Sequence, residues 1–242
     1  MKKITTIVLI IGGVFVLNNN LQAQAFQKGN FNLDIGLGFG VFGTKQTATT
    51  KLSFDAFGTP FSQTSVNDTS DGAASFIVPI GFEYGVSNKI GLGLEFSNSN
   101  YAIDENDREF VSSVKGLDFG IKVNYHLLNS EKNDLFIGIG FGFSKVNWTF
   151  KSDATNLFGL TTAAGSGRCF SIGVTDRIFF SDHFGIMFNL GYRGYTYPEI
   201  NYETGDVASA LEAFGATNVQ FSQQLEWKLN GVHIGAGLAI KF

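Results

Sequence analysis

Cysteine and charge are both scarce in this sequence. One cysteine, Cys169, among 242 residues excludes an internal disulfide, and we expect it to act as a small buried hydrophobic residue rather than a reactive thiol. Charged residues make up 16% of the chain, against about 25% in ordinary soluble domains. The Lys and Arg residues form no basic cluster, so a nucleic-acid partner is not expected.

Long apolar runs are missing beyond the N-terminus. No segment there approaches the roughly 20 apolar residues that a membrane-spanning helix needs. Because lipid cannot satisfy free backbone polar groups, a membrane protein without such helices has to be a closed β-barrel. No spacing of ligand residues indicates a metal site. A G-x-G-x-x-G match at 38–43 lies inside an alternating strand with no helix after it, so we expect no dinucleotide or other cofactor.

The first 25 residues have the composition of a secretory signal peptide. Lys2 and Lys3 precede a mostly apolar run over residues 4–17, and Ala23-Gln24-Ala25 follows with the small residues of a cleavage site. Cleavage after Ala25 fits this pattern best, and cleavage after Ala23 is the alternative. We therefore divide the chain into a signal peptide, residues 1–25, and one domain, residues 26–242.

The rest of the chain alternates apolar with small or polar residues, which is the period of a β-strand. The final stretch shows it most clearly, because every second residue from Val232 to Phe242 is apolar. The same pattern predicts eight strands, at about 29–42, 73–86, 90–97, 114–127, 135–150, 168–180, 184–197 and 219–242. In the fifth strand the alternation changes phase near Ser144, which predicts a bulge unless the strand has already left the membrane.

The connections between these strands are alternately long and short. Short ones follow the second, fourth and sixth strands, and long polar ones, such as 43–71, follow the others. Outer-membrane barrels have short periplasmic turns and long extracellular loops in this order, whereas a soluble eight-stranded barrel does not need the rhythm. We therefore expect an all-β fold, an eight-stranded antiparallel up-and-down transmembrane β-barrel with both chain ends on the periplasmic side.

The final strand also carries a resemblance to a known family. Its alternating apolar residues lead to an aromatic end: Leu238, Ile240 and Phe242. This resembles the C-terminal strand of bacterial outer-membrane β-barrel proteins, including the barrel-only small OmpA-like and PorT-like proteins. The resemblance implies residence in a Gram-negative outer membrane among lipids and lipopolysaccharide, and recognition of these residues by the barrel assembly machinery. It does not imply one activity.

Charged residues fall on the predicted lumen face, which is the small and polar face of each strand. Strand direction places a lower tier near the periplasm: Asp34, Glu83, Lys122, Arg177 and Lys241. It places an upper tier nearer the extracellular side: Glu95, Asp118, Arg193 and His233. Eight strands leave a lumen only wide enough for side chains to fill, and unpaired buried charge is costly. We therefore expect both tiers to pair internally and to block the lumen.

The function expected from these features is not enzymatic. We expect a structural role, or binding of an extracellular or envelope protein, still unidentified, through the extracellular loops, where a short helix over 207–214 is a candidate contact. A small channel or carrier for hydrophobic or small solutes is the alternative. An outer-membrane lipid-modifying enzyme is less favoured, because His126, His183 and His233 are poorly placed to join a nucleophile and an acid.

Overall fold

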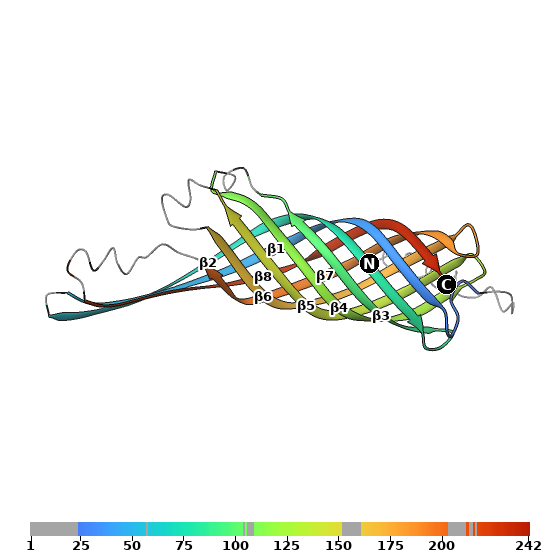
Figure 1. Cartoon of the computed structure of the whole chain (residues 1–242), viewed down its shortest axis with the longest axis horizontal. Helices are drawn as coiled ribbons and strands as arrows, with labels where there is room; N and C mark the ends of the chain where they lie inside the picture. Colours follow the sequence, from blue (N-terminus) through green and yellow to red (C-terminus); the bar gives the residue numbers. More distant parts are fainter. Residues whose placement is uncertain are drawn as a thin grey trace, which may run out of the picture.

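The computed structural model describes residues 24–242 except 57, 104, 106–108, 152–160, 203–211, 213, 214 and 216. Its strands are β1 Phe31–Ala56, β2 Thr59–Gly85, β3 Ile90–Tyr101, β4 Val111–Asn129, β5 Asn133–Phe150, β6 Thr162–Phe179, β7 Phe184–Tyr202 and β8 Thr217–Lys241. They pair antiparallel in chain order, and β8 closes the ring against β1 (Figure 1). The expected eight-stranded antiparallel up-and-down barrel is confirmed.

The two ends of the barrel differ in their connections. Short turns at 86–89, 130–132 and 180–183 join β2 to β3, β4 to β5 and β6 to β7, where the sequence placed them. This end is termed the short-turn end, and the chain enters β1 and leaves β8 there (Figure 1). The opposite end is termed the long-loop end. The predicted helix over 207–214 lies, apart from Glu212, outside the described residues.

The segment 43–71, expected to be a long polar loop, is instead strand. β1 and β2 stay in register as far as Ala56↔Thr59, and β8 follows β1 as far as Asp55↔Thr217. Beyond the barrel rim these three strands form a sheet, termed the extension, that projects from the long-loop end (Figure 1). The expectation was wrong because pairing satisfies the backbone whatever the side chains are, and the segment is rich in β-branched threonine, which favours strands.

The outer face of the barrel is apolar around its circumference. Most of the residues that alternation assigned to this face are exposed, among them Leu92 at 52%, Ile121 at 61% and Leu190 at 60%. Within the described part of the chain, no helix is long and apolar enough to span a membrane. The exposed fractions place on the outside of this barrel apolar side chains of the kind that a soluble protein would bury.

The bulge expected in β5 is absent. Ser144 and Val146 both face the lumen, with exposed fractions of 1% and 0%, and β5 pairs with β4 and β6 without a register shift between them. The alternation of β5 keeps the same phase along the strand. The apparent change arises because the lumen becomes apolar toward the long-loop end, where Val146 packs into a buried apolar cluster and Trp148 packs against it.

Candidate functional site

Arg177 of β6 lies at the centre of a charge cluster near the short-turn end. Its guanidinium contacts Asp34 at 2.6 Å, Glu83 at 2.6 Å and Asp134 at 3.0 Å. Its side chain is 1% exposed and lies over the ring of Phe136, 4.4 Å from the centroid. Three strands other than β6 therefore supply one carboxylate each to a single buried cation.

His126 of β4 completes this group, termed the lower cluster: Asp34, Glu83, His126, Asp134 and Arg177. One ring nitrogen, Nδ1, faces Asp134, and the other, Nε2, lies 3.1 Å from Glu83. Both ring nitrogens of His126 therefore lie next to carboxylates of this cluster. Arg177 and His126 together contact three carboxylates. Asn124 adds a hydrogen bond to Glu83 at 2.6 Å, so that each buried charge has polar partners.

A second group, termed the upper cluster, consists of Glu95, Asp118, Lys122 and Arg193. Glu95 accepts from Arg193 at 2.6 Å and from Lys122 at 3.2 Å. Asp118 accepts from the hydroxyls of Ser97, Ser144 and Tyr195. Two cations face two carboxylates here, so the upper cluster is balanced in charge.

Aromatic side chains fill the lumen beyond the upper cluster and form the aromatic layer: Phe42, Tyr101, Trp148, Tyr195, Tyr197 and Trp227. The ring of Trp227 lies 5.6 Å from Tyr101, 4.9 Å from Trp148 and 5.7 Å from Tyr197, measured between centroids. Such spacings are those of favourable aromatic pairs. The layer closes the lumen toward the extension.

A cavity of about 60 Å³ lies between the two charge clusters and is termed the central cavity. It is lined by groups of both clusters and by polar side chains such as Thr175, Asn189 and His233. A water molecule needs about 10–15 Å³ of such space. The central cavity therefore has room for a few water molecules between paired charges.

The structure places the predicted lumen charges differently in two cases. Lys122, predicted in the lower tier, reaches the upper cluster through Glu95, because a lysine side chain is long enough to extend along the lumen axis. Lys241 joins neither cluster; its ammonium lies 5.0 Å from the centre of the Phe179 ring. The other six predicted charges lie in the two clusters: Asp34, Glu83, Glu95, Asp118, Arg177 and Arg193.

Sequence reasoning missed Asp134 and did not place His126 in the charge network. Asp134 falls in a polar run that reads as a turn, but β5 already begins at Asn133. Ile137 and Leu135 point outward. Because side chains alternate between the two faces of a strand, continuing the strand back by one residue would have predicted that Asp134 faces the lumen. The structure shows Asp134 fully buried against Arg177 and His126.

The predicted assembly signal lies at the seam where the barrel closes. Leu238 and Phe242 are 55% and 67% exposed on the outer face, and Ile240 lies between them in the alternation. The backbone of Phe242 pairs with Phe31 in both directions, at 2.9 and 3.3 Å. These side chains are therefore accessible from outside the barrel.

Comparisons with known proteins give a likeness of fold. The sequence matches no protein-family model and no curated protein. Among solved structures, the outer membrane protein OprG from Pseudomonas aeruginosa is similar over 91% of this chain and 99% of its own, with a TM-score of 0.54 and 14% identity. The outer membrane protease OmpT from Escherichia coli covers 93% and 99%, with a TM-score of 0.43 and 12% identity. At 14% identity, the likeness to OprG shows a shared barrel fold.

Proposed function

We propose that this protein is an integral outer-membrane β-barrel with a closed lumen, and that it acts structurally or by binding a partner at its extracellular end. One observation carries the proposal: two internally paired charge clusters and the aromatic layer fill the lumen, while the extension projects beyond it. In this arrangement the short-turn end faces the periplasm. The apolar outer face then contacts lipid and lipopolysaccharide.

The apolar outer face supports membrane residence. Burying apolar surface contributes about 25 cal/mol per Å², and side chains such as Leu37, at 58% exposure, and Ile234, also at 58%, gain this only in lipid. An N-terminal signal peptide and recognition of Phe242 by the assembly machinery would bring the chain there. The likeness to OprG supports the same location.

Export and insertion can be tested separately. We expect the wild-type protein in the outer-membrane fraction, without Met1. Deletion of Phe242 should leave the chain able to cross the inner membrane but impair its insertion, because the terminal aromatic residue at the barrel seam would be missing. Cell fractionation with immunoblotting measures both. A soluble periplasmic pool of the wild-type protein would contradict the proposed location.

The extension supports a binding role. From residue 59 to 73, β2 pairs with β1 on one side and has no strand partner on the other among the described residues. A free strand edge can accept an added strand of another protein through backbone hydrogen bonds. The side chains here are mostly Thr, Ser, Asn, Gln and Asp, and exposed, which suits a surface that meets water when it is unoccupied.

A trimmed variant tests the binding role. Gln46 pairs with Thr69, so replacing residues 47–68 with an Asn-Gly turn should preserve the register and close a tight hairpin. In a deletion strain examined for envelope integrity, secretion and adhesion, we expect the wild-type chain to restore the affected trait and the trimmed chain to fail. The trimmed chain should still insert in normal amounts. Full restoration by the trimmed chain would contradict a role for the extension.

A non-enzymatic role is also part of the proposal. Both nitrogens of His126 face carboxylates, and Nδ1 of His183 faces a backbone carbonyl at 2.9 Å. His233 lines the central cavity with no hydroxyl or thiol bonded to its ring among the described residues. A catalytic histidine would need a nucleophile within hydrogen-bond reach. A small channel or carrier remains the second candidate, favoured by the central cavity.

A further inference from the structure

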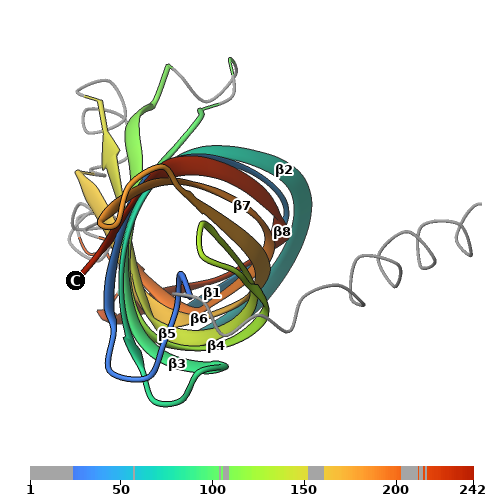
Figure 2. The ribbon, with the colours of Figure 1, turned by 90° about the vertical axis from the view of Figure 1, so that its right-hand side faces the viewer.

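The chain segment before β1 lies across the mouth of the barrel at the short-turn end. Figure 2 looks into this end and shows the N-terminal stretch, in blue, crossing it. Ala25 and Phe26 are both 0% exposed. Ala25 packs with the lumen residues Phe179, Met187 and Ala239. The segment is therefore part of the barrel's packed interior rather than a tail outside it.

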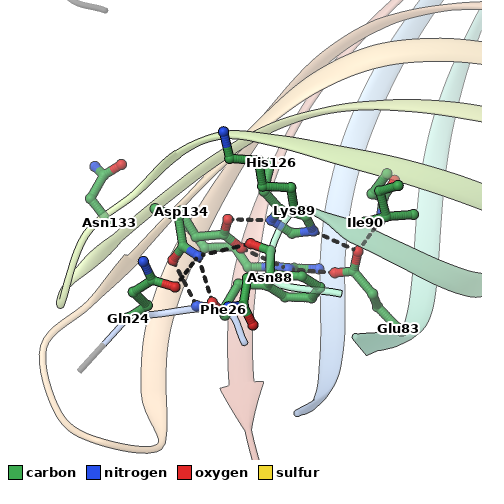
Figure 3. Close-up of polar contacts among 12 residues, drawn as sticks. Gln24, Phe26, Glu83, Asn88, Lys89, Ile90, His126, Asn133 and Asp134 are labelled. Carbon is green, nitrogen blue, oxygen red and sulfur yellow. Dashed lines mark hydrogen bonds and ion pairs between the residues drawn. The ribbon is translucent and has the colours of Figure 1, made fainter. Parts of the chain in front are cut away.

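The ring of Phe26 lies flat on the ring of His126. Their centroids are 3.5 Å apart and their planes differ by 9° (Figure 3 shows both residues). His126 holds two carboxylates of the lower cluster. Phe26 thus covers the face of the lower cluster that would otherwise meet periplasmic water.

Hydrogen bonds fix the segment to two turns of the mouth. Asn129 accepts from the amide of Phe26 at 2.9 Å and donates to its carbonyl at 2.5 Å and to Gln24 at 3.3 Å. Ala25 donates to the carbonyl of Ser130 at 2.6 Å. Lys28 donates to Asn88 at 3.0 Å. The segment is therefore held by the β4–β5 turn and the β2–β3 turn.

Gly85 at the end of β2 makes room for this segment. A Cβ atom at Gly85 would lie 2.2 Å from the carbonyl oxygen of Gln27 and 3.2 Å from the ring of Phe26. Because the nearer atom is backbone, any side chain here would force the segment to move. Glycine at this position is the one residue that permits so close an approach.

We propose that residues 24–29 form a plug that seals the periplasmic mouth, and that signal cleavage after Ala23 leaves the whole plug on the mature chain. Cleavage after Ala25 would remove the hydrogen bonds of Gln24 with Asn129 and of Ala25 with Ser130, and would take Ala25 out of its buried apolar cluster. The inference rests on the proposed export. The plug separates the lower cluster, and the central cavity behind it, from the periplasm.

Met187 is a natural reporter of the plug. It is the one methionine in residues 24–242, it belongs to the same buried apolar cluster as Ala25, and it is 6% exposed. Peroxide converts an accessible methionine to its sulfoxide, which intact-protein mass spectrometry detects. The rate of this oxidation in folded barrel in detergent measures how often the mouth opens.

Two variants should open the mouth by different means. We expect Gly85→Ala, which displaces the backbone of the plug, and Phe26→Ala, which removes the stacked ring, each to speed oxidation of Met187 about tenfold, equivalent to about 1.4 kcal/mol of opening free energy. Gly81→Ala is the matched control for the first, because its Cβ would meet Asp34 at an ordinary 3.7 Å. Phe31→Ala, on the outer face, is the control for the second. Both controls should oxidise at the wild-type rate.

The outcomes separate the plug from the export on which it rests. Wild-type oxidation rates in both Gly85→Ala and Phe26→Ala would overturn the plug. The mass of the mature wild-type chain should correspond to a start at Gln24, and a start at Phe26 would overturn the proposed cleavage site. A chain that still carries Met1 would contradict export itself while leaving the oxidation result intact.

Discussion

Arg177 is the guanidinium partner of three carboxylates in the lower cluster. Without it, Asp34, Glu83 and Asp134 would lose the guanidinium that they share, in a site that is almost free of solvent. Removing one partner of a buried ion pair costs about 3–5 kcal/mol, because an uncompensated charge stays behind. We therefore expect Arg177→Ala to lower the free energy of unfolding by about that amount, measured by reversible denaturation in detergent micelles.

The pair between Lys45 and Asp68 in the extension is the matched control for Arg177. Its atoms lie 3.1 Å apart, but both side chains are more than half exposed, and exposed pairs contribute about 0–1 kcal/mol. Lys45→Ala should therefore change the unfolding free energy little. Equal losses for Lys45→Ala and Arg177→Ala would mean that the lower cluster is not desolvated.

Outward residues test the facing of the strands. Leu92 and Ile139 are about half exposed on the outer face, and an arginine near the midplane of a bilayer costs about 2–4 kcal/mol. We expect that loss for Leu92→Arg and for Ile139→Arg when unfolding is measured in lipid vesicles. Thr64→Arg, in the exposed extension, should cost nothing measurable. No penalty at Leu92 and Ile139 would mean that these residues do not face lipid.

Alternation on its own could predict which residues enter the lumen but not how they pair. It placed Asp34, Glu83 and Arg177 on one face and in one tier, and the structure brings all three together. It could not show that Lys122 extends along the lumen to Glu95. The period of two gives the face on which a side chain lies, but not how far a long side chain reaches along the lumen. It also could not show that Gly91 leaves space for the Glu83 carboxylate, which a Cβ there would meet at 1.9 Å.

At the scale of strands, the lumen-facing half of each strand is not uniform. Toward the long-loop end, β5 and β8 turn apolar rings inward, so that Trp148 and Trp227 pack together in the aromatic layer. The alternation in the sequence places these rings on the lumen face. Because a polar lumen is expected, the apolar residues there indicate a change of phase and predict a bulge that the structure does not have. The extension was hidden for a related reason: its polar residues alternate with no apolar face to reveal a strand.

The aromatic layer should stabilise the barrel as a core does. Trp227 is 4% exposed, and replacing a buried tryptophan with alanine costs about 3–5 kcal/mol. We expect Trp227→Ala to lower the unfolding free energy by this amount in detergent. Phe188→Ala, on the outer face at 51% exposure, should cost clearly less. A smaller loss for Trp227→Ala than for Phe188→Ala would show that the layer is not tightly packed.

At the scale of the whole molecule, four features close the lumen in series. From the short-turn end these are the plug, the lower cluster, the upper cluster and the aromatic layer, with the central cavity between the two clusters. Opposite charges confined in a low-dielectric space attract strongly, so each cluster holds its side chains across the lumen rather than along its wall. An ion would have to break several buried pairs to pass.

Single-channel recording in planar bilayers tests this closed barrel most directly. The purified wild-type protein should give no steady conductance. Arg193→Ala, which removes the guanidinium partner of Glu95, should also stay silent, because the plug, the lower cluster and the aromatic layer still close the lumen. Insertion is verified by protease protection of the same preparation. Silent wild-type protein is the predicted result. Steady and reproducible wild-type conductance would contradict the closed lumen and establish the small channel in its place.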